Sequence, residues 1–236
     1  MTKLANLTIL INLSTSGSLI KKLEIESIRN FSRICIPTTY KQTHLPIIFI
    51  GPYGRKTVED IDEFMKKHVK VQDKEVLVIG SESPWIELIA LNNGAKKVTS
   101  VDYTIYPCED PRMNLMTTYE MNEKFLKNEL PLYDVVISFS SVEHSGLGRY
   151  GDNLNPWGDL IAMAKAWCLT KPNGSALVGL PVAEEDKIVF NSHKLYGPIM
   201  LSHIFANWKL EHTNLDLTKV MPNCDYCYQP LFVLRK

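Results

Sequence analysis

The chain has 236 residues, 45% of them hydrophobic and 22% charged, which is enough apolar material to bury the core of one domain. Its 26 basic residues balance its 26 acidic ones and its adjacent lysine pairs are isolated, so a nucleic-acid partner is not expected. No apolar run reaches the roughly 18 residues that cross a bilayer, so stable membrane insertion is not expected. The cysteines number five, an odd count that does not indicate a disulfide framework.

Residues 1–56 are predicted to form an amino-terminal extension. The apolar stretch at 4–13 is interrupted by polar residues and no clear cleavage site follows it, so it is a poor signal peptide and a cytoplasmic location is expected. A short strand is predicted at 47–50. Thr57 then stands where it can cap a helix whose apolar residues follow helical spacing.

Residues 75–102 indicate a strand, a tight turn, a helix and a second strand. The apolar run at 76–79 is typical of a strand buried on both faces of a parallel sheet, and Gly80 ends it. Ser83 is predicted to cap the helix, with Pro84 at its first position and Gly94 at its end. A helical crossover between neighbouring strands makes those strands parallel.

An acid, Asp102, ends the second strand, 22 residues beyond Gly80. In a doubly wound sheet this position allows the carboxylate to accept hydrogen bonds from both hydroxyls of a ribose. The alternative is an ordinary surface aspartate that follows a strand. The turn, Gly80-Ser81-Glu82-Ser83-Pro84, lacks the further glycines of a dinucleotide fingerprint, which disfavours an NAD-dependent oxidoreductase.

Further elements follow in order along the chain. Residues 117–120 fit a capping box, which gives Glu120 a structural role. A buried strand from Tyr133 runs into a polar loop at Glu143 and His144. A helix is predicted at 158–169, a turn at 171–174, a strand at 175–180 and a final antiparallel strand near 231–234.

These features resemble the class I S-adenosylmethionine-dependent methyltransferases. Such chains carry a VLxxG strand end, an acid after the second strand, a D-V-V-x-S strand that ends near E-H, and an L-x-K-P-x-G turn, and all four occur here in that order. The strings SSVEHSGLGRYGDNLNPWGDL and FNSHKLYGP are similar to an uncharacterised family, domain of unknown function 268, found in nematodes and bacteria. The resemblance implies a methyltransferase-like domain at 57–236. Its expected fold is α/β and doubly wound (Rossmann-like), with a mainly parallel seven-stranded sheet and helices on both faces.

The same resemblance implies S-adenosylmethionine as cofactor and a small molecule as methyl acceptor. The predicted cofactor-binding residues follow the strand ends, and they are Gly80, Ser81, Ser83, Asp102, Tyr103 and Ser140. The family usually has a glycine-rich turn here, against which the methionine part of the cofactor lies. Two serines, Ser81 and Ser83, stand at positions expected to be glycine, and a serine there either bonds the cofactor's carboxylate or fills its space.

Methyl transfer to a hydroxyl or an amine also needs a base. His144 is the predicted base because its pKa lies near operating pH, and Glu143 is predicted to orient it. The alternative is that His144 satisfies a backbone carbonyl while Glu143 caps the following turn. Substrate contacts are predicted in the glycine-punctuated loop that follows and after the fifth strand, at Arg149, Tyr150, Asp152, His193 and Tyr196. For the last two, the alternative is that Tyr196 packs a connection and His193 faces water.

A second function class remains open, namely a non-catalytic methyltransferase-like binding module, which the serine-filled turn would suit. No metal site is predicted, because Cys224 and Cys227 form the only C-x-x-C and no further ligands stand at zinc spacing.

Overall fold

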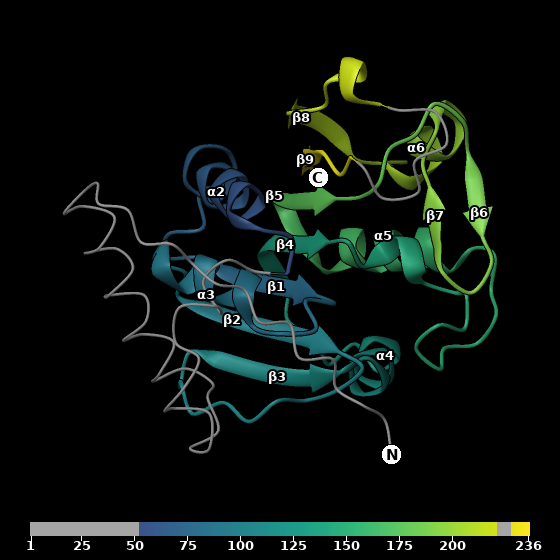
Figure 1. Cartoon of the computed structure of the whole chain (residues 1–236). Helices are drawn as coiled ribbons and strands as arrows, with labels where there is room; N and C mark the ends of the chain where they lie inside the picture. The colour runs from purple at the N-terminus through teal and green to yellow at the C-terminus, as the bar shows by residue number, and fades with distance from the viewer. Residues whose placement is uncertain (1–51, 221–227) are drawn as a thin grey trace, which may run out of the picture.

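The computed structural model describes residues 52–220 and 228–236, which form a seven-stranded sheet with helices on both faces (Figure 1). The strand order is β3-β2-β1-β4-β5-β9-β8. The strands β3, β2, β1, β4 and β5 run parallel to one another, whereas β9 runs antiparallel to both β5 and β8. The strands of the sheet are β1 (Glu75–Ile79), β2 (Lys97–Asp102), β3 (Met113–Thr117), β4 (Tyr133–Phe139), β5 (Thr170–Gly179), β8 (Lys209–Thr213) and β9 (Leu231–Arg235). The predicted doubly wound, mainly parallel sheet with an antiparallel last strand is therefore confirmed.

The central strand β1 shows why the parallel strands are continuously apolar. Successive side chains of a strand point to opposite faces. Val76 and Val78 pack into the core on one face, and Leu77 packs into the core on the other. Because helices cover both faces, each residue of this run must be apolar.

Two groups of helices cover the sheet. One face carries α2 (Arg55–Phe64), its π-helical continuation η3 (Met65–Val69) and α3 (Trp85–Asn92). The opposite face carries α4 (Thr118–Leu126), α5 (Gly158–Leu169) and α6 (Pro198–Ile204). The bounds of α5 are those predicted. The capping box of α4 is also confirmed, because Thr117 Oγ1 accepts from Glu120 N at 3.1 Å and Glu120 Oε2 accepts from Thr117 N at 2.7 Å.

A small antiparallel hairpin stands outside the main sheet, beside α5 (Figure 1). It consists of β6 (Lys187–Val189) and β7 (His193–Leu195), and it lies in the chain between β5 and α6. Two single turns of 3-10 helix, η4 (Val142–His144) and η5 (Leu217–Lys219), complete the elements of the described residues. The hairpin contacts η4, so it is placed beside the loop that follows β4.

The predicted helix starts are wrong at two places. Thr57 lies inside α2, which begins at Arg55, and its hydroxyl donates to Tyr53 O at 3.1 Å instead of capping the helix. No side chain of the described residues caps α3, which begins at Trp85 rather than Pro84, and Ser83 is exposed. Gly94 does end this helix with a left-handed φ of 81°.

Two further predictions differ from the structure. The predicted turn at 171–174 is an irregularity within β5, opposite a register shift between Tyr133 and Val135 of β4. Cys108 is disulfide-bonded, which the odd cysteine count did not predict, whereas Cys168 is free. The predicted strand at 47–50 and the cysteines at 224 and 227 lie outside the described residues.

Candidate active site

The candidate site lies where β1, β2 and β4 end, at Gly80, Asp102 and Ser140. Gly80 has a φ of 69°, and a Cβ added to it would lie 1.8 Å from Ser141 Oγ. Both the backbone conformation and the close packing therefore require glycine. The turn after β1 is in this way held against the turn after β4, and the two turns lie together at the carboxyl edge of the sheet, which is where doubly wound folds have their ligand crevice.

Asp102 joins the end of β2 to the turn after β1. Its Oδ2 accepts from Glu82 N at 2.6 Å, and its Oδ1 accepts from Tyr103 N at 2.6 Å. The residue is 9% exposed, so it is not the ordinary surface aspartate of the alternative. A carboxylate offers about four acceptor positions, and two remain beyond these backbone bonds.

A buried acid that the sequence reasoning missed lies directly beneath the turn. Glu87, on α3, is 0% exposed, and its Oε1 accepts from Ser81 Oγ at 2.6 Å and from Ser100 Oγ at 2.5 Å. Burial raises the pKa of Glu87 to about 7. The hydroxyl of Ser81 thus points into the protein, so it neither faces a cofactor nor fills its space, while Ser83 is exposed on the turn. In the sequence, the sign of this buried acid was a single glutamate within the otherwise apolar segment 85–91.

The buried Glu87 predicts a pH-dependent stability. Its pKa rises from 4.5 to about 7 on folding, so between these values the folded protein holds a proton that the unfolded chain has released. The resulting stability is fully present below the unfolded pKa and is lost as the pH rises through the folded pKa. Between pH 5 and pH 8 the free energy of unfolding is therefore expected to fall by about 2–3 kcal/mol.

Urea unfolding at both pH values measures this effect, with Glu87→Gln as the comparison because its amide resembles the neutral acid. The variant is expected to lose about 2 kcal/mol less than the unsubstituted protein on going to pH 8. An equal loss in both proteins would contradict the prediction.

Glu143 and His144 lie on η4, just beyond β4. His144 Nδ1 is 2.5 Å from Ser192 O, and because a carbonyl only accepts, Nδ1 carries the proton and Nε2 carries the lone pair. Nε2 lies 3.7 Å from Glu143 Oε1, too far for a hydrogen bond. Burial lowers the pKa of His144 and raises the pKa of Glu143 to about 7. The histidine does satisfy a backbone carbonyl, as the structural alternative expected, yet it keeps one nitrogen able to accept a proton.

The loop after η4 returns to the end of β2. Tyr150 stacks on Tyr103 with ring centroids 5.5 Å apart and planes at 20°. The Arg149 guanidinium lies 5.6 Å from the Tyr150 ring and donates to Ser192 Oγ at 3.1 Å. Asp152 Oδ2 accepts from Gly146 N at 2.6 Å and fixes the loop. Since β1 lies between β2 and β4, the tyrosine stack connects the segments that follow the strands on either side of β1.

Two residues predicted to contact the substrate, His193 on β7 and Tyr196 just after it, lie in the interior of the protein. His193 is buried, so the alternative in which it faces water is wrong, and its ring centroid is 6.3 Å from that of His144. Tyr196 is also buried and donates from its hydroxyl to Asp159 Oδ2 at 3.0 Å. Lys194, 1% exposed, forms an ion pair with the same Asp159 and donates to Pro156 O at 2.7 Å. This buried network holds the hairpin to the start of α5, and the structure does not bring Tyr196 into the crevice.

Two further residues reach the crevice from outside the predicted set. The Tyr53 ring packs against Phe139 with centroids 5.0 Å apart and against Trp85 at 5.9 Å, and burial raises the pKa of its hydroxyl. Gln229 Nε2 donates to Ser140 Oγ at 3.1 Å. Ser140 itself has a left-handed backbone conformation, with a φ of 49°. Sequence patterns gave no signal for either, because each reaches the site from a segment far away in the chain.

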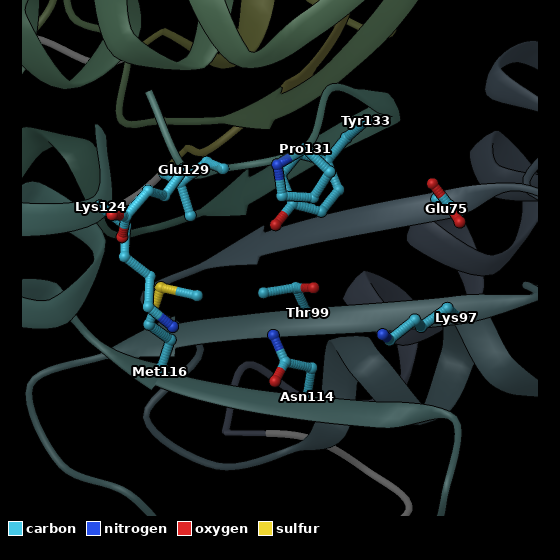
Figure 2. Close-up of a pocket in the computed structure, with 10 residues that line it drawn as sticks. Glu75, Lys97, Thr99, Asn114, Met116, Lys124, Glu129, Pro131 and Tyr133 are labelled. Atoms are coloured by element: carbon cyan, nitrogen blue, oxygen red, sulfur yellow. The ribbon is translucent and has the colours of Figure 1, made fainter. Parts of the chain in front are cut away.

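Two cavities lie at the opposite edge of the sheet, where the parallel strands begin. The first, of about 290 Å³, has Thr99 and Asn114 on its floor and Glu75, Lys97, Lys124 and Glu129 around it (Figure 2). The second, of about 410 Å³, lies at the start of β4 and β5. No predicted site residue lines either cavity. Among the described residues, each helix is too short or too polar to span a bilayer.

Comparisons with known proteins define the family and the fold. The family described as "Caenorhabditis protein of unknown function, DUF268" matches residues 73–218, and none of the curated proteins matches. Among solved structures, the chain is similar to 1,6-didemethyltoxoflavin-N1-methyltransferase of Burkholderia thailandensis, which has bound 1,6-didemethyltoxoflavin and S-adenosylhomocysteine. The TM-score is 0.56 at 11% identity, over 96% of this chain and 93% of that one.

A second similar structure is an O-methyltransferase family protein from Burkholderia thailandensis. Its TM-score is 0.55 at 11% identity, over 77% of this chain and 55% of that one, so the chain spans about half of that protein's length. At these identities the likeness shows the fold alone, which is a methyltransferase-like α/β fold.

Proposed function

This chain belongs to the DUF268 family and has a methyltransferase-like fold, and from that premise we propose that it transfers a methyl group from S-adenosylmethionine to a small-molecule acceptor. The observation that carries the proposal is the position of Asp102. Its carboxylate lies at the carboxyl end of β2, bonded to the turn after β1, with acceptor positions left for two ribose hydroxyls.

The residues around the crevice fit this cofactor. Gly80 leaves the backbone of the turn bare, and the Ser81 hydroxyl is held away by Glu87. Tyr103 follows Asp102 and offers an aromatic face, which stacks on Tyr150 in this structure. When bound, S-adenosylmethionine supplies the methyl group and leaves as S-adenosylhomocysteine. The protein's tasks are then to position the acceptor and to remove its proton.

We assign the proton-accepting role to His144. Its Nδ1–H is held by Ser192 O, which leaves Nε2 as the basic atom, and its lowered pKa keeps the imidazole neutral at neutral pH. Glu143 is wholly buried with its Oε1 3.7 Å from Nε2, so we propose that it acts on the imidazole through its charge, while the bond to Ser192 O sets the orientation of the ring. Arg149, Tyr150 and Asp152 shape the acceptor side of the crevice, while His193 and Tyr196 support this side from behind.

Calorimetric titration with S-adenosylmethionine and S-adenosylhomocysteine tests the cofactor, with NAD as the control. Binding of the first two ligands alone supports the proposal and justifies a screen of small-molecule acceptors. Failure of the purified protein to bind either ligand would overturn it.

Asp102→Ala is expected to weaken S-adenosylhomocysteine binding by about 10- to 100-fold, because two hydrogen bonds to a charged acceptor are lost. Asp186→Ala is the matched control, since Asp186 also accepts from backbone N–H groups, those of Gly197 and Met200, but at the start of α6. The control is expected to lose stability and keep the affinity. Unchanged affinity in the Asp102 variant would remove this residue from the site.

A non-catalytic binding module is the second candidate. It is favoured by the enclosure of the acid–base pair, since Glu143 is 0% exposed and His144 is 8% exposed. Mass spectrometry of acceptor mixtures incubated with S-adenosylmethionine distinguishes the two, because tight cofactor binding without any methylated product would favour the module.

A further inference from the structure

The cavity of about 410 Å³ at the start of β4 and β5 concentrates positive charge. Lys70, Lys74, Lys171 and Arg235 line it, and Asp134 is its one lining carboxylate. The four cations come from three segments of the chain: Lys70 and Lys74 precede β1, Lys171 lies near the start of β5, and Arg235 ends β9. In a chain whose net charge is zero, this convergence is a local feature that costs repulsion unless a counter-charge is supplied.

Neighbouring side chains neutralise only half of these cations. Lys171 Nζ lies 3.0 Å from Asp134 Oδ2, and Arg235 Nη2 lies 2.8 Å from Glu211 Oε2. Lys70 and Lys74 make no ion pair within the described residues. Two ammonium groups therefore remain for an external anion, next to two cations that are already held in place.

The wall of the cavity is rigid where β5 begins. A Cβ added to Gly174 would lie 2.6 Å from Thr170 Cγ2 and 2.9 Å from Asp134 O, so the backbone segments are in close contact there. Asn173, with a φ of 62°, accepts at its carbonyl from Arg235 Nη1 at 2.9 Å. Since Lys171 and Arg235 are fixed by these contacts, their charges are preorganised, which lowers the entropic cost of binding.

We propose that this cavity binds a small, multiply charged oxyanion of the phosphate class. The ammonium groups of Lys70 and Lys74 contact the anion, and Lys171 and Arg235 add to the positive potential around it. The cations surround one cavity rather than extending along a surface, which suits a compact anion and not a nucleic-acid backbone. The site lies at the opposite edge of the sheet from the crevice and does not depend on methyl transfer.

Calorimetric titration with inorganic pyrophosphate, at an ionic strength held constant with sodium chloride, tests the proposal without S-adenosylmethionine. The cavity variant is the double substitution Lys70→Gln and Lys74→Gln. The matched control is Lys66→Gln with Lys67→Gln, which removes the same charge from lysines paired with Asp62 and Glu63 outside the cavity. All four lysines are exposed, so both variants are expected to fold.

The unsubstituted protein and the control are expected to bind pyrophosphate with similar affinity, and the cavity variant about tenfold or more weakly. No heat of binding above the sodium chloride blank, or an equal loss of affinity in both variants, would overturn the proposal. Because the probe is pyrophosphate alone, a failed methyltransferase assay leaves this result unaffected.

Discussion

Replacing Lys194 with methionine is expected to lower the free energy of unfolding by about 3–5 kcal/mol. The ammonium group is 1% exposed, pairs with Asp159 and donates to Pro156 O. Its removal leaves the Asp159 carboxylate buried, and among the described residues the Tyr196 hydroxyl, at 3.0 Å, is then the side chain that still donates to it. An uncompensated buried charge is among the most destabilising single changes in a protein.

Urea unfolding measures this change in the free energy of unfolding, and two further variants serve as comparisons. Lys66→Met breaks an exposed pair with Asp62 on adjoining helical turns and is expected to cost less than about 1 kcal/mol. Adding Asp159→Asn to Lys194→Met removes the stranded charge and keeps an acceptor for Tyr196, so it is expected to restore part of the stability. A loss below about 1 kcal/mol for Lys194→Met would show that the pair adds little to folding.

His144→Ala is expected to lower kcat about 100-fold or more at unchanged affinity for S-adenosylhomocysteine, if the histidine accepts the acceptor's proton as proposed. The unsubstituted enzyme is expected to lose activity as the pH falls through the pKa of His144, which burial holds below its usual 6.5, because the imidazole becomes protonated there. Its basic Nε2 then has no lone pair to offer.

His203→Ala is the control, since His203 is exposed on α6. The proton-accepting role predicts a loss of kcat and of the acidic limb of the pH profile, with the protein still folded. A variant that loses stability while its folded fraction turns over normally would instead assign His144 to holding Ser192 in place.

The main elements of the fold were predictable because their signals are local. The apolar run before Gly80 is buried on both faces, and the segment at 158–169 forms α5 with the predicted bounds. Helix starts were less predictable because caps compete with tertiary contacts. The hydroxyl of Thr57 reaches back to Tyr53 O, and Ser83 stays in an exposed turn whose neighbour Glu82 is held by Asp102.

The site was predictable where it follows from strand ends and not where it depends on distant contacts. Asp102 and Gly80 could be placed by their position after β2 and β1. The bond from Ser81 to Glu87 could not, because the same serine fits a cofactor-facing turn equally well in the sequence. The cationic cavity was hidden for a similar reason, since its lysines and arginine are spread from residue 70 to residue 235 and form no cluster in the sequence.

The position of β9 has a consequence for biosynthesis. Leu231–Arg235 form a strand that fills the gap between β5 and β8 and pairs with both. Until these residues have emerged from the ribosome, β5 and β8 each have an edge without a partner, and unpaired strand edges promote aggregation. A chaperone that shields β5 while these edges are unpaired would therefore be expected to raise the yield of folded protein.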